Sequence, residues 1–135
     1  MKTYVIAYLA TALVFLGIDS VWLTLAASRL YKPLLGDMLA DGFNVAPAII
    51  FYVVYIGGIV YFAIQPALTT GSAVTAALNG AVLGFVAYAT YDLTNQATLK
   101  NWPVQITIAD LCWGTVLTAT SATLGFIIAR HFSRL

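Results

Sequence analysis

Residues 4–27 read YVIAYLATALVFLGIDSVWLTLAA, and Asp19 is the only charged side chain in this apolar run. A helix that crosses the hydrocarbon core of a bilayer needs about 20 mostly apolar residues, each adding about 1.5 Å. The run meets that length. Lys2 before it is also typical of a secretory signal, but the run is longer than a signal core and three similar runs follow. We therefore expect a spanning helix rather than a cleaved signal.

Three further apolar runs cover residues 45–65, 72–93 and 104–129. Of the 135 residues in the chain, 61% are hydrophobic and 8% are charged, which is far from the balance of a water-soluble domain. The sequence therefore predicts an all-α fold, a bundle of four transmembrane helices that forms one integral membrane domain over residues 1–135. The lipid bilayer is its first expected partner.

The connections between the runs differ in character. Residues 28–44 have the only water-facing composition, so we expect a connecting loop there, with room for a short interfacial helix. Residues 66–71 are short and uncharged, and Pro66 is expected to end the second span. Residues 94–103 are polar, and Trp102 is interpreted as an interfacial belt residue. The short second connection makes the second and third spans adjacent and antiparallel.

A stripe of small residues runs along the third span at four-residue spacing, as Ala76, Gly80 and Gly84. Small residues at this spacing let two helices approach closely in lipid. The stripe predicts a packing seam, either within the bundle or between protomers of a homo-oligomer.

Lysine and arginine give a weak signal for orientation, because three lie near each membrane face. The densest basic end is Arg130, His131 and Arg134, which favours cytoplasmic termini. The formal net charge is +1 and no face gathers lysine or arginine, so nucleic acid is not an expected partner.

The chain contains no glutamate, and three of its aspartates, Asp19, Asp92 and Asp110, fall inside or at the edge of apolar runs. An ionisable residue within a span costs about 2.5–3.5 kcal/mol on insertion scales and usually turns toward the bundle interior. Because the spans alternate in direction, the ends of the first and third spans and the start of the fourth lie toward one membrane face. We therefore expect the three carboxyl groups to meet in a polar cup near that face.

The first and last spans repeat the pattern Asp-x-x-Trp-x-Thr, first as Asp19, Trp22 and Thr24 and then as Asp110, Trp113 and Thr115. Residues three apart share a helix face, so each tryptophan lies on the stripe of its own aspartate. Each indole then either walls the cup, where its face suits an organic cation or a flat ring, or donates its N–H to the aspartate. The sequence leaves both interpretations open.

Around Asp92 the sequence places Tyr88 one turn earlier, and Asn95 and Lys100 beyond. Carboxylates gathered in a low-dielectric site cannot all stay ionised, so proton uptake is an expected part of any cycle. The candidate ligand-binding or proton-binding residues are Asp19, Trp22, Thr24, Tyr88, Asp92, Asn95, Lys100, Asp110, Trp113 and Thr115. The structural alternative is a buried polar network that fixes helix register and has no turnover.

Three functions fit such a cup. The first is binding or translocation of a small polar or cationic solute, or of protons, which in a narrow four-span protomer would require a homo-oligomer. The second is a membrane enzyme that acts on a lipid or isoprenoid, with Asp19, Asp92 or Asp110 as general acid or base. Against it, the spans contain no histidine, and the chain has no nucleophile-and-base motif, metal motif or phosphate loop. The third is an accessory subunit of a larger membrane complex.

Metal and cofactor ligands are scarce. Cys112 is the only cysteine and His131 the only histidine, so the chain offers no intramolecular disulfide and no metal site built on these ligands. No lysine lies within a span, which argues against a retinal-type Schiff base. We expect no metal and no cofactor.

Residues 91–103 read YDLTNQATLKNWP, and Asp110, Trp113 and Gly114 follow. This combination resembles the signature of an uncharacterised family of small bacterial membrane proteins, domain of unknown function 2177, and the similarity extends over the whole chain. The resemblance implies a polytopic protein of the bacterial inner (cytoplasmic) membrane. Since the family has no established activity, the resemblance implies no catalytic roles.

Overall fold

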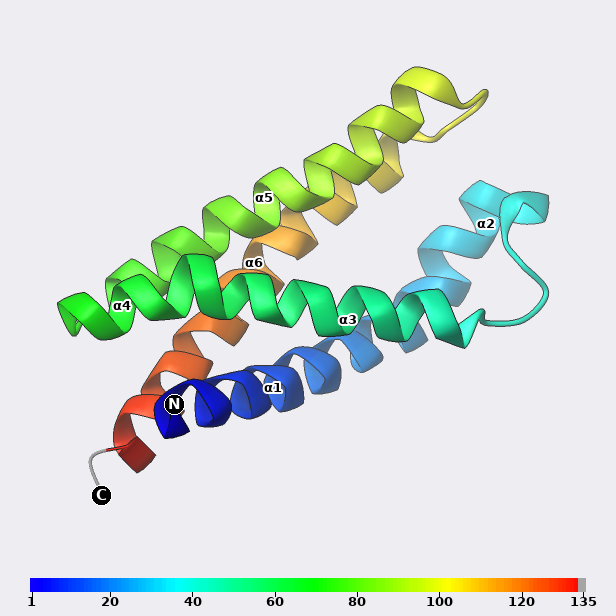
Figure 1. The fold of residues 1–135 in the computed structure, drawn as a ribbon. Helices are drawn as coiled ribbons and strands as arrows, with labels where there is room; N and C mark the ends of the chain where they lie inside the picture. The colour runs from blue at the N-terminus through cyan, green and yellow to red at the C-terminus, as the bar shows by residue number, and fades with distance from the viewer. Residues whose placement is uncertain (134–135) are drawn as a thin grey trace.

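The computed structural model describes residues 1–133, and all regular structure in that range is helical (Figure 1). The elements follow in the order α1 (Lys2–Ala26), η1 (Ala27–Tyr31), α2 (Lys32–Leu35), η2 (Gly36–Met38), α3 (Val45–Ile59), η3 (Val60–Ile64), α4 (Gln65–Thr70), α5 (Ala73–Thr98) and α6 (Val104–Ser133). The elements η1 and η3 are π-helical, and η2 is a 3₁₀ turn.

These elements join into four rods that are long and apolar enough to cross a membrane, Lys2–Met38, Val45–Thr70, Ala73–Thr98 and Val104–Ser133. The all-α fold with four spanning helices predicted from the sequence is therefore confirmed.

The central helix of the bundle is α6, because α5 packs antiparallel along it and α1 packs against a different face (Figure 1). The core between the helices contains fully buried Phe15 of α1, Ile59 of α3, Ile64 of η3 and Leu117 of α6. From this core α3 continues through η3 and α4, which pack against α5. Toward its N-terminal end α3 instead diverges from α5 (Figure 1).

The small-residue stripe forms the seam between α5 and α6. A Cβ at Gly80 would lie 2.9 Å from both the Ala122 Cβ and the Thr118 carbonyl oxygen, and a Cβ at Gly84 would overlap the Gly114 carbonyl oxygen. Close approach of the two backbones thus requires glycine at both positions. Of the two predicted locations, the seam lies within the bundle, and its glycines are buried there rather than free to contact another protomer.

The connection over residues 28–44, expected as a loop with room for a short interfacial helix, is helical for most of its length. The first rod continues through η1, α2 and η2 to Met38, so only residues 39–44 lack helical structure. Proline cannot donate to the helix ladder, and its ring crowds the carbonyl four residues earlier. The π-helical η1 lies directly before Pro33, and an inserted residue at that point is one way to relieve the conflict.

Pro66 likewise does not end the second rod, which continues to Thr70 and stops where Gly71 adopts φ 70°. The π-helical η3 again lies just before the proline. Pro66 has no N–H for the Phe62 carbonyl oxygen, and Asn79 of α5 donates a 3.1 Å hydrogen bond to that oxygen from its amide. A neighbouring helix thus satisfies a backbone group that the proline leaves free, as lipid requires.

Candidate functional site

The close contact of α5 and α6 at the glycine seam determines which side chains of the two helices face each other farther along. One turn beyond Gly84 is Tyr88, whose ring lies against Gly114, where a Cβ would overlap it. Because antiparallel helices advance in opposite directions, one further turn brings Asp92 opposite Asp110. The two carboxyl groups lie beside each other, with exposed fractions of 0% for Asp92 and 6% for Asp110.

On α1, Asp19 is 7% exposed and accepts two hydrogen bonds from other helices. The Tyr52 hydroxyl of α3 donates to Oδ2 at 2.7 Å, and the Trp113 indole N–H of α6 donates to Oδ1 at 3.2 Å. Both donors are uncharged. Asp19 therefore links three helices while its negative charge has no cationic partner in these bonds.

Each tryptophan of the repeated motif is hydrogen-bonded, directly or through Tyr31, to the aspartate of the other helix. Trp113 of α6 donates to Asp19 of α1, whereas Trp22 of α1 donates at 3.2 Å to the Tyr31 hydroxyl, which donates in turn to Asp110 of α6. The two indoles stack with their centroids 4.5 Å apart and their planes 10° from parallel. Each N–H is thus engaged in a hydrogen bond, and no flat ring fits between the two stacked faces.

Asp92 differs from the other two carboxyl groups. Neither of its oxygens has a hydrogen-bond partner within residues 1–133, and the carboxyl group of Asp110 lies beside it. Two carboxyl groups side by side repel each other when both are ionised, and a proton on one of them removes that repulsion.

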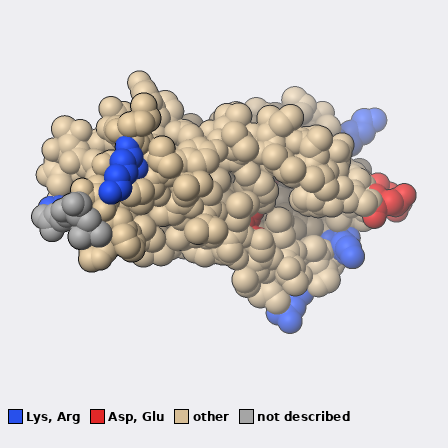
Figure 2. Space-filling view, turned by 60° about the horizontal axis from the view of Figure 1, so that its bottom comes forward, with Lys and Arg blue, Asp and Glu red and all other residues tan. Residues whose placement is uncertain are grey.

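A pocket of about 250 Å³ opens between the helices. Its lining joins Asp19 and Asp110 to a ring of aromatic side chains, Trp22, Tyr31, Phe43, Phe51, Tyr52, Tyr88, Tyr91 and Trp113, with Leu23 and Ala48 beside them. We call this the aspartate pocket. Its described lining contains no lysine or arginine. In Figure 2 the charged side chains gather at the two ends of the molecule, and a small acidic area is visible between tan side chains in the middle.

Five of the predicted site residues are absent from the lining of the aspartate pocket, and one of them is the fully buried Asp92. The Thr24 and Thr115 hydroxyls donate to carbonyl oxygens of their own helices, at 2.8 Å and 2.7 Å. A residue five positions after an aspartate is rotated by about 140° around the helix, so the threonines of the repeated motif face away from its carboxylates. Asn95 is not part of the lining, and Lys100 is exposed in the turn after α5. Lys100, which was predicted as a site residue, is therefore not part of the pocket.

Several residues of the pocket were not among the predicted ones. Tyr31 fell in the expected loop, and it faces Asp110 only because the first rod continues through η1. Phe51 and Tyr52 lie on α3, and the richness of that span in aromatic residues was the one signal that pointed to them. A pattern based on acidic residues alone could not locate uncharged donors from other helices.

Among residues 1–133 no group of three or more histidine, cysteine, aspartate and glutamate side chains is arranged to hold a metal ion. The chemistry that the pocket offers is that of acceptor oxygens and aromatic faces, which bind cations and hydrogen-bond donors.

Comparison with known proteins gives one match. The model of the family described as "Predicted membrane protein (DUF2177)" matches residues 4–127, which is most of the chain. No curated protein and no solved structure matches the chain.

Proposed function

We propose that this chain, which belongs to the DUF2177 family of predicted membrane proteins, binds a small organic cation of the ammonium type in the aspartate pocket. The observation that carries the proposal is the composition of the pocket. Two buried carboxyl groups, Asp19 and Asp110, face a ring of aromatic side chains, and no lysine or arginine is among the described lining residues.

Charge balance supports a cation rather than a neutral ligand. The donors to Asp19 and Asp110 are tyrosine and tryptophan, which satisfy oxygens without supplying positive charge. A buried carboxylate without a counter-charge is costly, and a bound cation removes that cost. Aromatic faces add attraction for a quaternary or protonated amine. A space of about 250 Å³ suits a small organic cation.

The Asp92 and Asp110 pair favours proton exchange as part of the same function. When the pocket is empty, a proton shared by the two carboxyl groups reduces the buried negative charge. When a cation enters, the pair can release that proton, so Asp110 faces the ligand in its charged form, while Asp92 stays outside the lining. Cation binding is then expected to release about one proton per site.

To test the proposal, the affinity of the protein in lipid nanodiscs for tetramethylammonium is measured by titration calorimetry. Replacing Asp19 with asparagine removes one carboxylate from the pocket, so Asp19→Asn is expected to weaken binding by about tenfold or more. Asp37→Asn is the matched control, because Asp37 is exposed on η2 and does not line the pocket. Equal affinity of the wild type, Asp19→Asn and Asp37→Asn, with all three folded by thermal melting, would overturn the proposal.

For orientation, we propose the bacterial inner membrane with both termini in the cytoplasm. The basic end carries Arg130 and His131 in the last turn of α6, while Arg134, the third residue of the predicted basic end, lies outside the described residues. The aspartate pocket lies toward the opposite end and so opens toward the periplasm.

Cysteine labelling checks this orientation. In a Cys112→Ser background, Asp41→Cys in the first connection is expected to react with a membrane-impermeant maleimide in intact cells, whereas Lys2→Cys is expected to react only after lysis. The reverse labelling pattern would mean that the pocket opens to the cytoplasm.

A further inference from the structure

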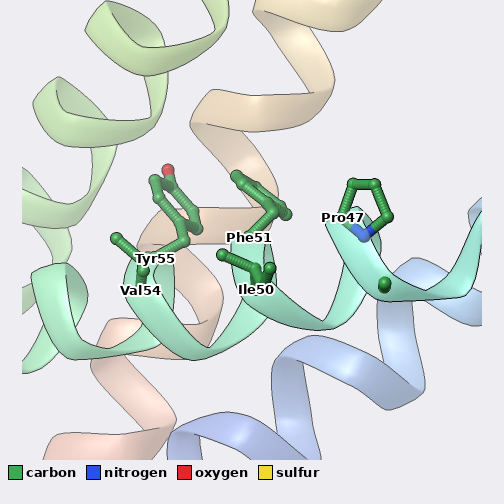
Figure 3. A pocket seen from close by; sticks show the side chains of 6 residues that line it. Pro47, Ile50, Phe51, Val54 and Tyr55 are labelled. Carbon is green, nitrogen blue, oxygen red and sulfur yellow. The ribbon is translucent and has the colours of Figure 1, made fainter.

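A groove of about 590 Å³ runs along α3 beside the aspartate pocket. Its lining consists of Ala46, Pro47, Ile50, Phe51, Val54 and Tyr55, and we call it the α3 groove (Figure 3). The Tyr55 hydroxyl is hydrogen-bonded to Thr118 Oγ1 at 2.8 Å, so the residue presents its ring rather than its polar atom. The described lining is thus apolar along its whole length.

The α3 groove and the aspartate pocket adjoin each other at one residue. Phe51 lines both, and its ring stacks on that of Tyr55 with centroids 5.2 Å apart. Tyr52, the next residue along α3, donates to Asp19 inside the pocket. A molecule that occupied both spaces would therefore place a polar group at the carboxylates and an apolar chain along α3.

The α3 groove also faces lipid. Ile50 and Val54 are 63% and 68% exposed, and the N-terminal part of α3 diverges from α5 (Figure 1). Residues 46–55 rise by about 14 Å along the helix, which is long enough for most of a dodecyl chain. A ligand with an aliphatic tail can therefore enter sideways from the bilayer without leaving its apolar surroundings.

We infer that the ligand is a single-chain amphiphile whose ammonium head group binds in the aspartate pocket and whose aliphatic tail lies in the α3 groove. The inference rests on the proposed cation binding and adds the class of ligand. The charge of the head complements Asp19 and Asp110, and the tail matches the apolar lining. A fully hydrophilic cation would leave the groove to lipid, whereas an uncharged lipid would leave the carboxylates without a partner.

The test compares tetramethylammonium with dodecyltrimethylammonium for binding to the protein in nanodiscs. Ile50→Trp fills the α3 groove with a bulky ring and leaves the aspartate pocket unchanged. It is expected to weaken dodecyltrimethylammonium binding by about tenfold, because the tail loses its site, and to change tetramethylammonium binding by less than about twofold. Ile49→Trp is the matched control, since Ile49 is also lipid-facing, 55% exposed and absent from the groove lining.

The outcomes separate this inference from the proposed function. If Ile50→Trp and Ile49→Trp bind dodecyltrimethylammonium as tightly as the wild type, the tail does not use the α3 groove and the inference is wrong, although the cation pocket stands. If neither probe binds the wild type, the proposed cation binding fails and the inference fails with it.

Discussion

Replacing Gly84 with leucine is expected to prevent α5 from packing on α6 and to abolish the native fold. A single Cβ at this position would already overlap the Gly114 carbonyl oxygen and lie close to the Thr118 side chain. Backbone atoms cannot move aside as a flexible side chain can, so the two helices must separate. The expected cost is about 4 kcal/mol or more, at the large end of single substitutions. The measurement is thermal melting of the purified protein, with monodispersity on a sizing column.

Gly17→Leu is the matched control for this prediction. Gly17 lies in the middle of α1, and a Cβ there meets nothing within 4 Å in the described structure. Leucine is a better helix former than glycine, so this variant is expected to be as stable as the wild type or slightly more stable. If Gly84→Leu melts like Gly17→Leu, the close seam between α5 and α6 is wrong, and the placement of Asp92 opposite Asp110 is wrong with it.

The seam illustrates how much of the fold the sequence could predict. The spacing of Ala76, Gly80 and Gly84 indicates a close helix contact, but it carries no information on whether the partner helix belongs to the same chain. Helix ends were harder to predict, because Pro33 and Pro66 have the local signature of a stop. Each instead follows a π-helical turn, and an amide on another helix bonds the carbonyl that Pro66 leaves free. Such compensation depends on tertiary neighbours that no local pattern contains.

The same limit applies to the aspartate pocket. The burial cost of Asp19, Asp92 and Asp110 predicts that they face inward, and the alternation of span directions predicts the end at which they meet. The hydrogen-bond donors are set by three-dimensional neighbours, so Tyr31 and Tyr52 could not be derived from spacing. The threonines of the repeated motif were misplaced for a different reason, since a five-residue step changes the helix face.

Replacing Asp92 with asparagine is expected to stabilise the protein, although the residue is completely buried. Neither oxygen of Asp92 accepts a hydrogen bond from a donor in the described range, and Asp110 beside it is also acidic. Asparagine keeps the shape, removes the repulsion between two carboxyl groups, and can donate its amide N–H to Asp110. The expected gain is about 2 kcal/mol, read as a higher melting temperature in nanodiscs.

The same substitution at Asp19, Asp19→Asn, is expected to lower the stability of the protein instead of raising it. Each carboxylate oxygen of Asp19 accepts one hydrogen bond, from Tyr52 or from Trp113. The NH2 group of asparagine would face one of these two donors and could not accept its hydrogen bond. A loss of about 1–2 kcal/mol is expected, because one buried donor is left without a partner.

A stabilised Asp92→Asn that also stops releasing protons on cation binding would identify Asp92 as a residue kept for function at a cost in stability. A destabilised Asp92→Asn would instead mean that its carboxyl group holds the helices together, and another group would then have to carry the proton.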